Sequence, residues 1–121
     1  MNIYSNTDAL AKALNASWLR GEVISNNIAN VDTPGYKRRE VAFEGYLAEA
    51  LKNPNSKRSN KMRELVPKVY TDNAHLSYRL DGNNVDIDTE MAYMAQNQIK
   101  YNTLISQVNY DFKRLKNALE R

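Results

Sequence analysis

Cysteine is absent from this chain, which excludes disulfide bonds, thiolate metal sites and thiol catalysis. Glycine is also scarce: the four glycines are scattered and form no phosphate-binding loop, and no G-x-S-x-G nucleophile motif is present. The single histidine, His75, has no neighbouring residues in a ligand or acid–base pattern. These absences predict a non-enzymatic protein with no catalytic residues, cofactor or bound metal.

Long apolar runs are missing too. No stretch of about 18 apolar residues occurs, so no transmembrane helix and no direct membrane insertion are expected. The N-terminus also lacks the basic start, apolar stretch and small-residue cleavage site of a secretory signal. If the protein leaves the cytoplasm, we expect it to use a route that needs no cleaved signal.

The charges are unevenly distributed along the chain, although the formal net charge is only +3. The segment 52–68 is strongly basic, but it has no interleaved aromatic residues and no nucleic-acid-binding fold signature. A solvated loop is therefore the preferred interpretation, and no nucleic-acid partner is expected. The segment 81–90 carries acidic residues and no basic ones, and Asp86, Asp88 and Glu90 fit helix capping better than an EF-hand calcium loop.

The N-terminal third contains a heptad pattern, with mainly apolar positions separated alternately by four and three residues. These positions are Leu10, Leu14, Ser17, Gly21, Ile24, Ile28 and Val31. Two of them, Ser17 and Gly21, are small enough to let a neighbouring backbone approach closely. Trp18 and Leu19 lie off this seam, and a second contact surface would explain them.

A longer seam with the same alternation occupies the C-terminal third. It consists of Met91, Met94, Gln98, Tyr101, Ile105, Val108, Phe112, Leu115 and Leu119, of which only Gln98 is polar. The predicted fold class is mainly α, with the two heptad helices paired as a coiled coil; an ordinary helical-bundle core remains the alternative. The longer seam should overhang the shorter one, and apolar residues outside both seams favour assembly with other chains.

The predicted organisation is one structural unit with three segments: an N-terminal coiled-coil helix (1–33), a turn, linker and small variable region (34–84), and a C-terminal coiled-coil helix (85–121). The middle segment is expected to be irregular or to contain a β-hairpin. Residues 40–53 are compatible with a short strand or a helical turn. "LVPKVYTD" and "HLSYRLDGN" are rich in β-forming residues and could pair with each other, with a turn at Asp81–Gly82.

A turn is predicted directly after the first helix, in "NNIANVDTPGYK". A residue before proline avoids the helical region, so the helix must end by Thr33. Pro34 fixes φ and Gly35 allows positive φ, which predicts a type II turn over Thr33–Tyr36. Beyond it, Arg38 and Arg39 could either contact an adjacent subunit or be solvated. The residues singled out in this turn motif are Asn30, Asp32, Thr33, Pro34, Gly35 and Tyr36.

The stretch "NNIANVDTPGYKRR" resembles the signature that follows the first helix of the flagellar rod, hook and hook-associated axial proteins. The C-terminal "NNVDIDTEMAYMAQNQIKYNTLISQVNYDFKRLKNAL" is similar to the proximal-rod branch of that family. Other rod proteins tend to end in a "V…EM…MI…RAYEAN" pattern, whereas this chain has "DIDTEMAYMAQNQIKYN". The resemblance covers approximately residues 5–45 and 80–120 and is weak in the middle.

This resemblance implies a structural subunit of the flagellar basal-body proximal rod, whose terminal helices pair into a coiled-coil layer. In the family these helices pack side by side in a tube that spans the periplasm and transmits the torque needed for motility. The implied partners are other copies, other rod proteins, and the inner-ring and export-gate adaptor proteins. The implied route is unfolded export through the flagellar type III apparatus. The residues alone leave one main alternative, a soluble coiled-coil adaptor that binds a partner helix.

Overall fold

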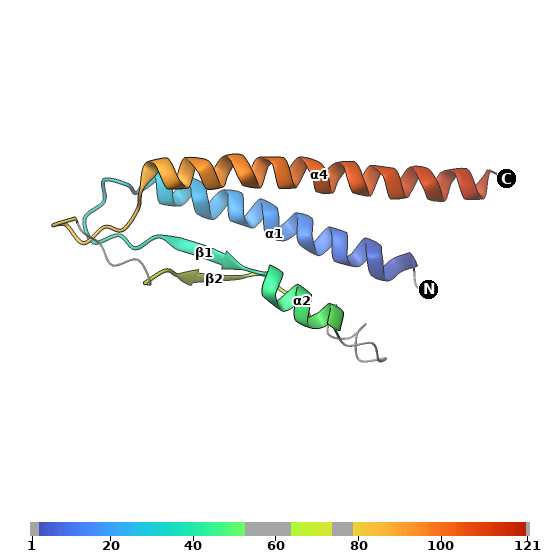
Figure 1. Ribbon diagram of the computed structural model, residues 1–121, viewed down its shortest axis with the longest axis horizontal. Helices are drawn as coiled ribbons and strands as arrows, with labels where there is room; N and C mark the ends of the chain where they lie inside the picture. The colour runs from blue at the N-terminus through green and yellow to red at the C-terminus, as the bar shows by residue number, and fades with distance from the viewer. Residues whose placement is uncertain (1–2, 53–63, 74–78, 121) are drawn as a thin grey trace.

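Long helices and one two-stranded sheet form the part of the chain described by the computed structural model, residues 3–52, 64–73 and 79–120 (Figure 1). The elements in chain order are α1 (Ile3–Ala29), β1 (Arg39–Ala42), α2 (Glu44–Lys52), β2 (Lys68–Thr71) and α4 (Ile87–Leu119). The predicted class is confirmed: the fold is mainly α, its terminal helices pair, and a small antiparallel sheet lies between them in sequence.

The two long helices run antiparallel, with α1 lying between α4 on one side and the sheet and α2 on the other (Figure 1). Two contacts establish this direction: Ser17 bonds Asn97, and Asn27 bonds Glu90. The residue number increases along α1 while that of its partner in α4 decreases. Both termini lie at the same end, where α4 continues past the start of α1. The overhang expected from the unequal seams is therefore present. No helix in the described ranges is apolar enough over 18 residues to cross a membrane.

The strand predicted in "LVPKVYTD" is confirmed as β2, but its partner differs from the expected one. β2 pairs with β1 in an antiparallel register that places Glu40 opposite Tyr70. The reason is that α1 anchors β1: Asn27 bonds both the N–H and the carbonyl of Arg39, and Arg20 donates to the carbonyl of Val41. The strand expected in "HLSYRLDGN" (75–83) is not seen in the residues that the structure describes there. Residues 79–81 form a bend and turn, and 74–78 lie outside the described residues.

A small apolar core joins α1 to the segment that follows β1. Ala16, Phe43 and Leu65 are buried together, and Ala9, Ala13 and Leu47 pack against them. The alanines leave room for the Phe43 ring on this face of α1, while Ile24 is buried on the face toward α4. α1 therefore does have a second contact surface, but Trp18 does not belong to it, since that side chain is 60% exposed.

The predicted turn is confirmed by its backbone geometry. Gly35 has φ of +73°, and the N–H of Tyr36 donates to the carbonyl of Thr33 at 3.2 Å, as a type II turn requires. The preceding helix ends at Ala29, so Val31 lies in the following turn and not in the helix, contrary to its predicted seam position. At the other helix, one of the predicted capping residues is confirmed as the cap: Asp86 accepts a hydrogen bond from the N–H of Asp88.

Candidate assembly site

Asn27 sits at the centre of a buried polar cluster near the end of α1, and its side chain is fully shielded from solvent. Its amide nitrogen donates to the carbonyl of Arg39 at 2.9 Å and to a carboxylate oxygen of Glu90 at 3.2 Å. Its amide oxygen accepts from the N–H of Arg39 at 2.9 Å and from the Tyr36 hydroxyl at 3.1 Å. A side-chain amide has two donors and two acceptor positions, so the hydrogen-bonding capacity of Asn27 is fully used.

Arg38 connects three elements through buried charge. Its Nε donates to Glu90 at the start of α4, and its Nη1 donates to Asp72 just after β2, each at 2.6 Å. The guanidinium also lies 5.5 Å from the centre of the Tyr93 ring. Burial lowers the pKa of Arg38, but the hydrogen bonds to Glu90 and Asp72 outweigh that effect and raise the pKa above its ordinary value.

Asn83, from a distant part of the chain, donates hydrogen bonds to the backbone that follows the end of α1. Its fully buried amide nitrogen lies within 3.0 Å of the carbonyl oxygens of Asn30, Val31 and Thr33. These carbonyls follow the end of a helix, where backbone acceptors need partners from elsewhere. The N–H of Gly35 donates to the carbonyl of Asp81 at 2.7 Å. The two turns, 30–36 and 79–84, are therefore bonded to each other.

These contacts change the interpretation of the turn motif. Arg38 was expected either to contact an adjacent subunit or to be solvated, and both alternatives are wrong, because its ionised group is paired inside the molecule. The Tyr36 hydroxyl is likewise used by Asn27. Arg39 keeps an exposed side chain. The motif thus serves mainly to join α1, the sheet and the start of α4.

The structure divides the predicted seam residues between shielded and exposed positions. Ser17 and Ile24 are buried, whereas Leu10, Leu14, Gly21, Ile28, Val31, Met94, Tyr101, Ile105 and Val108 are half-buried. Met91, Phe112, Leu115 and Leu119 are exposed, to between 44% and 79%. The exposed members all belong to α4, and three of them lie in its overhanging C-terminal part.

The shielded face of α4 is shifted by one residue from the predicted seam at two positions. Glu90 is buried where the seam has Met91, and Asn97 is buried where the seam has Gln98. Asn97 accepts a hydrogen bond from the Ser17 hydroxyl at 3.0 Å and donates to the Ser17 carbonyl at 2.9 Å. A methyl group added at Gly21 would lie 3.4 Å from the Asn97 amide. The small positions of α1 thus accommodate a polar side chain at this point.

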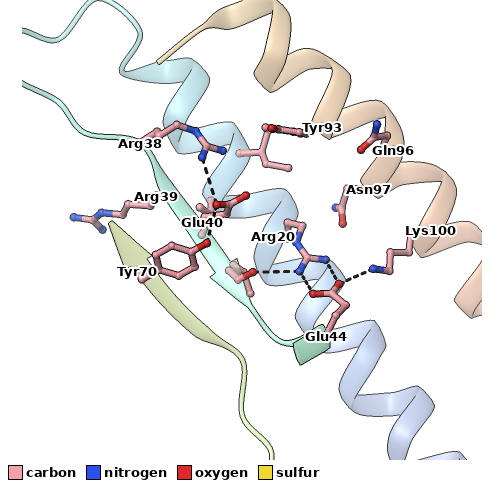
Figure 2. A pocket seen from close by; sticks show the side chains of 13 residues that line it. Arg20, Arg38, Arg39, Glu40, Glu44, Tyr70, Tyr93, Gln96, Asn97 and Lys100 are labelled. Atoms are coloured by element: carbon pink, nitrogen blue, oxygen red, sulfur yellow. Dashed lines mark hydrogen bonds and ion pairs between the residues drawn. The ribbon is translucent and has the colours of Figure 1, made fainter. Parts of the chain in front are cut away.

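A groove of about 350 Å³ lies beside this pair, between β1 and the middle of α4 (Figure 2). At one end, Glu44 accepts hydrogen bonds from Arg20 at 2.6 and 2.7 Å and from Lys100 at 2.5 Å. Burial raises the pKa of Glu44, but the bonds from these two cations outweigh it and lower the pKa to about 2. At the other end, the Tyr70 hydroxyl donates to Glu40 at 2.8 Å, and this bond raises the pKa of Tyr70.

Sequence reasoning missed the buried asparagines, because it relied on the spacing of the apolar residues. One available signal is the seven-residue interval between Glu90 and Asn97, which places both on one face of α4. The fold and these surfaces define a helical structural protein, in which a polar cluster ties the paired terminal helices to a small sheet. In the part of the chain described, no group of three His, Asp or Glu side chains could hold a metal ion.

Comparisons with known proteins give this structural class a family. The family model described as "Flagella basal body rod protein" matches residues 8–37, which include most of α1 and the turn motif. The flagellar basal body rod protein FlgB of Bacillus subtilis is 36% identical, over 98% of this chain and 97% of its own length. Those of Borrelia hermsii and Escherichia coli are 38% and 32% identical, over 93% and 90% of this chain and 95% and 88% of their own lengths.

This chain therefore belongs to the FlgB family of flagellar basal body rod proteins. That family is a structural one and not an enzyme family.

Proposed function

We propose that this protein is a proximal-rod subunit that assembles with copies of itself and with other rod proteins into the periplasmic shaft of the flagellum. Family membership supports a structural role in the basal body. We further propose unfolded export through the flagellar type III apparatus, and contacts with inner-ring and export-gate adaptor proteins. The predicted segments 1–33, 34–84 and 85–121 act as one unit in this proposal, because Asn27, Arg38 and Glu90 bond across them.

The observation that carries the proposal is a set of apolar side chains on α4 that remain exposed in the isolated subunit. Phe112 is 57% exposed and Leu119 79% exposed, on the part of the helix that extends past α1. Leu115 is exposed on the same part of the helix, and exposed apolar residues elsewhere on the helix pair are Trp18, Met91, Ile99 and Tyr110. Burying such side chains between neighbouring subunits is favourable by about 25 cal/mol per Å² of apolar surface. Assembly through the long helices would bury this surface.

The test separates assembly from folding with two aspartate substitutions. Leu119→Asp places a charge on the exposed overhang, where the isolated subunit should tolerate it. Ile24→Asp places a carboxylate in the buried contact between α1 and α4, where it should destabilise the subunit by several kcal/mol. Each variant replaces the wild-type protein in its own bacterium, and motility, purified basal bodies and the unfolding free energy of the isolated protein are measured.

We expect Leu119→Asp to fold normally and yet to reduce rod assembly and motility. The matched control is Asn109→Asp, which adds the same charge at an exposed polar position of α4 and should leave both unchanged. Normal rods in a strain from which the gene is deleted would contradict the proposed function. A defined dimer or trimer in light scattering, with no further growth, would instead support the soluble adaptor.

A further inference from the structure

The groove between β1 and α4 has an apolar floor and a rim that carries charge. Val23 and Ile24 of α1 and Val41 of β1 line it from below and are buried. Its charged lining residues are Arg20, Arg38, Arg39, Lys100, Glu40 and Glu44. Figure 2 shows most of these side chains around the space between the strand and the helix, whereas the Arg39 side chain projects from the other side of β1, away from that space. The combination suits an apolar side chain that has charged groups on either side of it.

Positive charge is in excess at the end of this rim where Lys100 lies. Arg38 is neutralised from inside by Glu90 and Asp72. Arg20 and Lys100 share the single carboxylate of Glu44, so one of the two cations has no carboxylate of its own. Arg39 has an exposed side chain, but it projects away from the groove (Figure 2). An incoming carboxylate could therefore pair with Lys100 without removing a buried charge from its partner.

The same chain carries a surface of complementary chemistry at the start of α4. Asp86, Ile87 and Asp88 are all exposed there, and Ile87 is 43% exposed between the two carboxylates. This tip, defined as Asp86–Asp88, thus presents an apolar side chain flanked by negative charge. Nine residues of helix separate Ile87 from Gln96 of the groove, or roughly 14 Å at 1.5 Å per residue. A tip docked in a neighbour's groove would set neighbouring subunits in a stagger of about that size along the helices.

We infer that the groove between β1 and α4 receives the Asp86–Asp88 tip of a second copy of this chain. Ile87 would enter above the apolar floor, and Asp88 would pair with Lys100. The two surfaces differ, so the contact is heterologous; it leaves a free tip and a free groove on every pair and can propagate as an open helical array. The inference rests on the proposed function and adds to it a specific contact between adjacent subunits.

A charge-reversal cycle tests this pairing in the full chain. Lys100→Glu and Asp88→Arg are made singly and together, and assembly is followed by sedimentation velocity across protein and salt concentrations. Each single variant should weaken association by about 10-fold, and the combined variant should recover most of that loss, because opposite charges again face each other. Lys113→Glu, an exposed reversal on α4 away from the groove, is the control and should have no such effect. Urea unfolding confirms that each variant is folded.

The outcomes distinguish this contact from the proposed function as a whole. If the wild-type chain assembles and Leu119→Asp prevents it, but the charge reversals have no effect or do not rescue each other, only the tip-and-groove contact is overturned. If the wild-type chain does not associate at all, both the contact and self-assembly are overturned. Rescue in the combined variant, lost again at high salt, supports the contact.

The lack of native cysteine makes a second measurement available. Gln96→Cys lies in the groove and Asp88→Cys on the tip, and a chain that carries both should form a ladder of disulfide-linked oligomers on mild oxidation. Each single-cysteine chain can form dimers at most. Equal products from the double and single variants, under conditions where the protein assembles, would contradict the contact.

Discussion

The side-chain amide of Asn27 donates to the carboxylate of Glu90 at 3.2 Å, and both side chains are buried. The two residues are 63 positions apart in sequence. Glu90 also accepts a hydrogen bond from Arg38, so one carboxylate joins the end of α1, the approach to β1 and the start of α4. This arrangement makes the relative position of the two long helices dependent on a few polar side chains.

Removing the Glu90 charge should destabilise the fold strongly. Glu90→Gln takes one of two close carboxylates from the buried Arg38, and breaking a buried ion pair in this way costs about 3–5 kcal/mol. The free energy of unfolding in urea measures the loss. Glu22→Gln on the exposed side of α1 removes the same charge and should change stability by less than about 0.5 kcal/mol. Similar stability of the Glu90 variant and wild type would mean that the ion pair is not formed in solution.

Neighbouring asparagines at the end of α1 provide a second matched comparison. Asn27→Asp removes the donor to the Arg39 carbonyl and brings a carboxylate against Glu90, so we expect a loss of at least about 2 kcal/mol. Asn26→Asp makes the same chemical change at an exposed side chain and should have little effect. Thermal unfolding followed by circular dichroism compares them, and equal midpoints for the two variants would refute the role given to Asn27.

Gly35 is predicted to matter through its backbone alone. Its φ is +73°, yet a methyl group at this position would meet no atom within 4 Å. Gly35→Ala should therefore cost about 1–2 kcal/mol, the price of the left-handed conformation for a residue with a Cβ. Gly45→Ala, in α2 with equally open space around it, should instead stabilise the protein by about 0.5–1 kcal/mol. Chemical denaturation of both variants tests this opposite pair of effects.

Acid stability should depend on Glu44. Its pKa falls from 4.5 to about 2 on folding, so its ion pairs stabilise the protein above pH 4.5, and this contribution is lost as the pH falls from 4.5 toward 2. Because its side chain is 47% exposed, the contribution should be no more than about 1 kcal/mol. Glu44→Gln should lower stability at pH 6 and flatten the acid dependence of the melting temperature. Glu49→Gln, at an exposed position of α2, should leave that dependence as in wild type.

Several features followed from the sequence because their causes are local. The heptad spacing predicted both long helices, and Pro34 and Gly35 predicted the turn that follows the first one. Asp86 was recognised as a cap because its side chain reaches an amide only two residues away. The β-forming residues of "LVPKVYTD" likewise identified a strand. In each case the deciding interactions lie within a few residues of one another.

Tertiary structure alone decided which polar groups are buried and what each segment packs against. Burial of Arg38 is favourable only because Glu90 and Asp72 arrive from segments far along the chain. The partner of β2 was decided by the side chains of α1 that hold β1 in place. Periodicity determined that α4 has an apolar face, but near the start of α4 the buried residues are Glu90 and Asn97, each one position before a seam residue. The physical reason is that a buried polar group requires a partner, and only the folded chain brings Asn97 to Ser17 and Asn27 to Glu90.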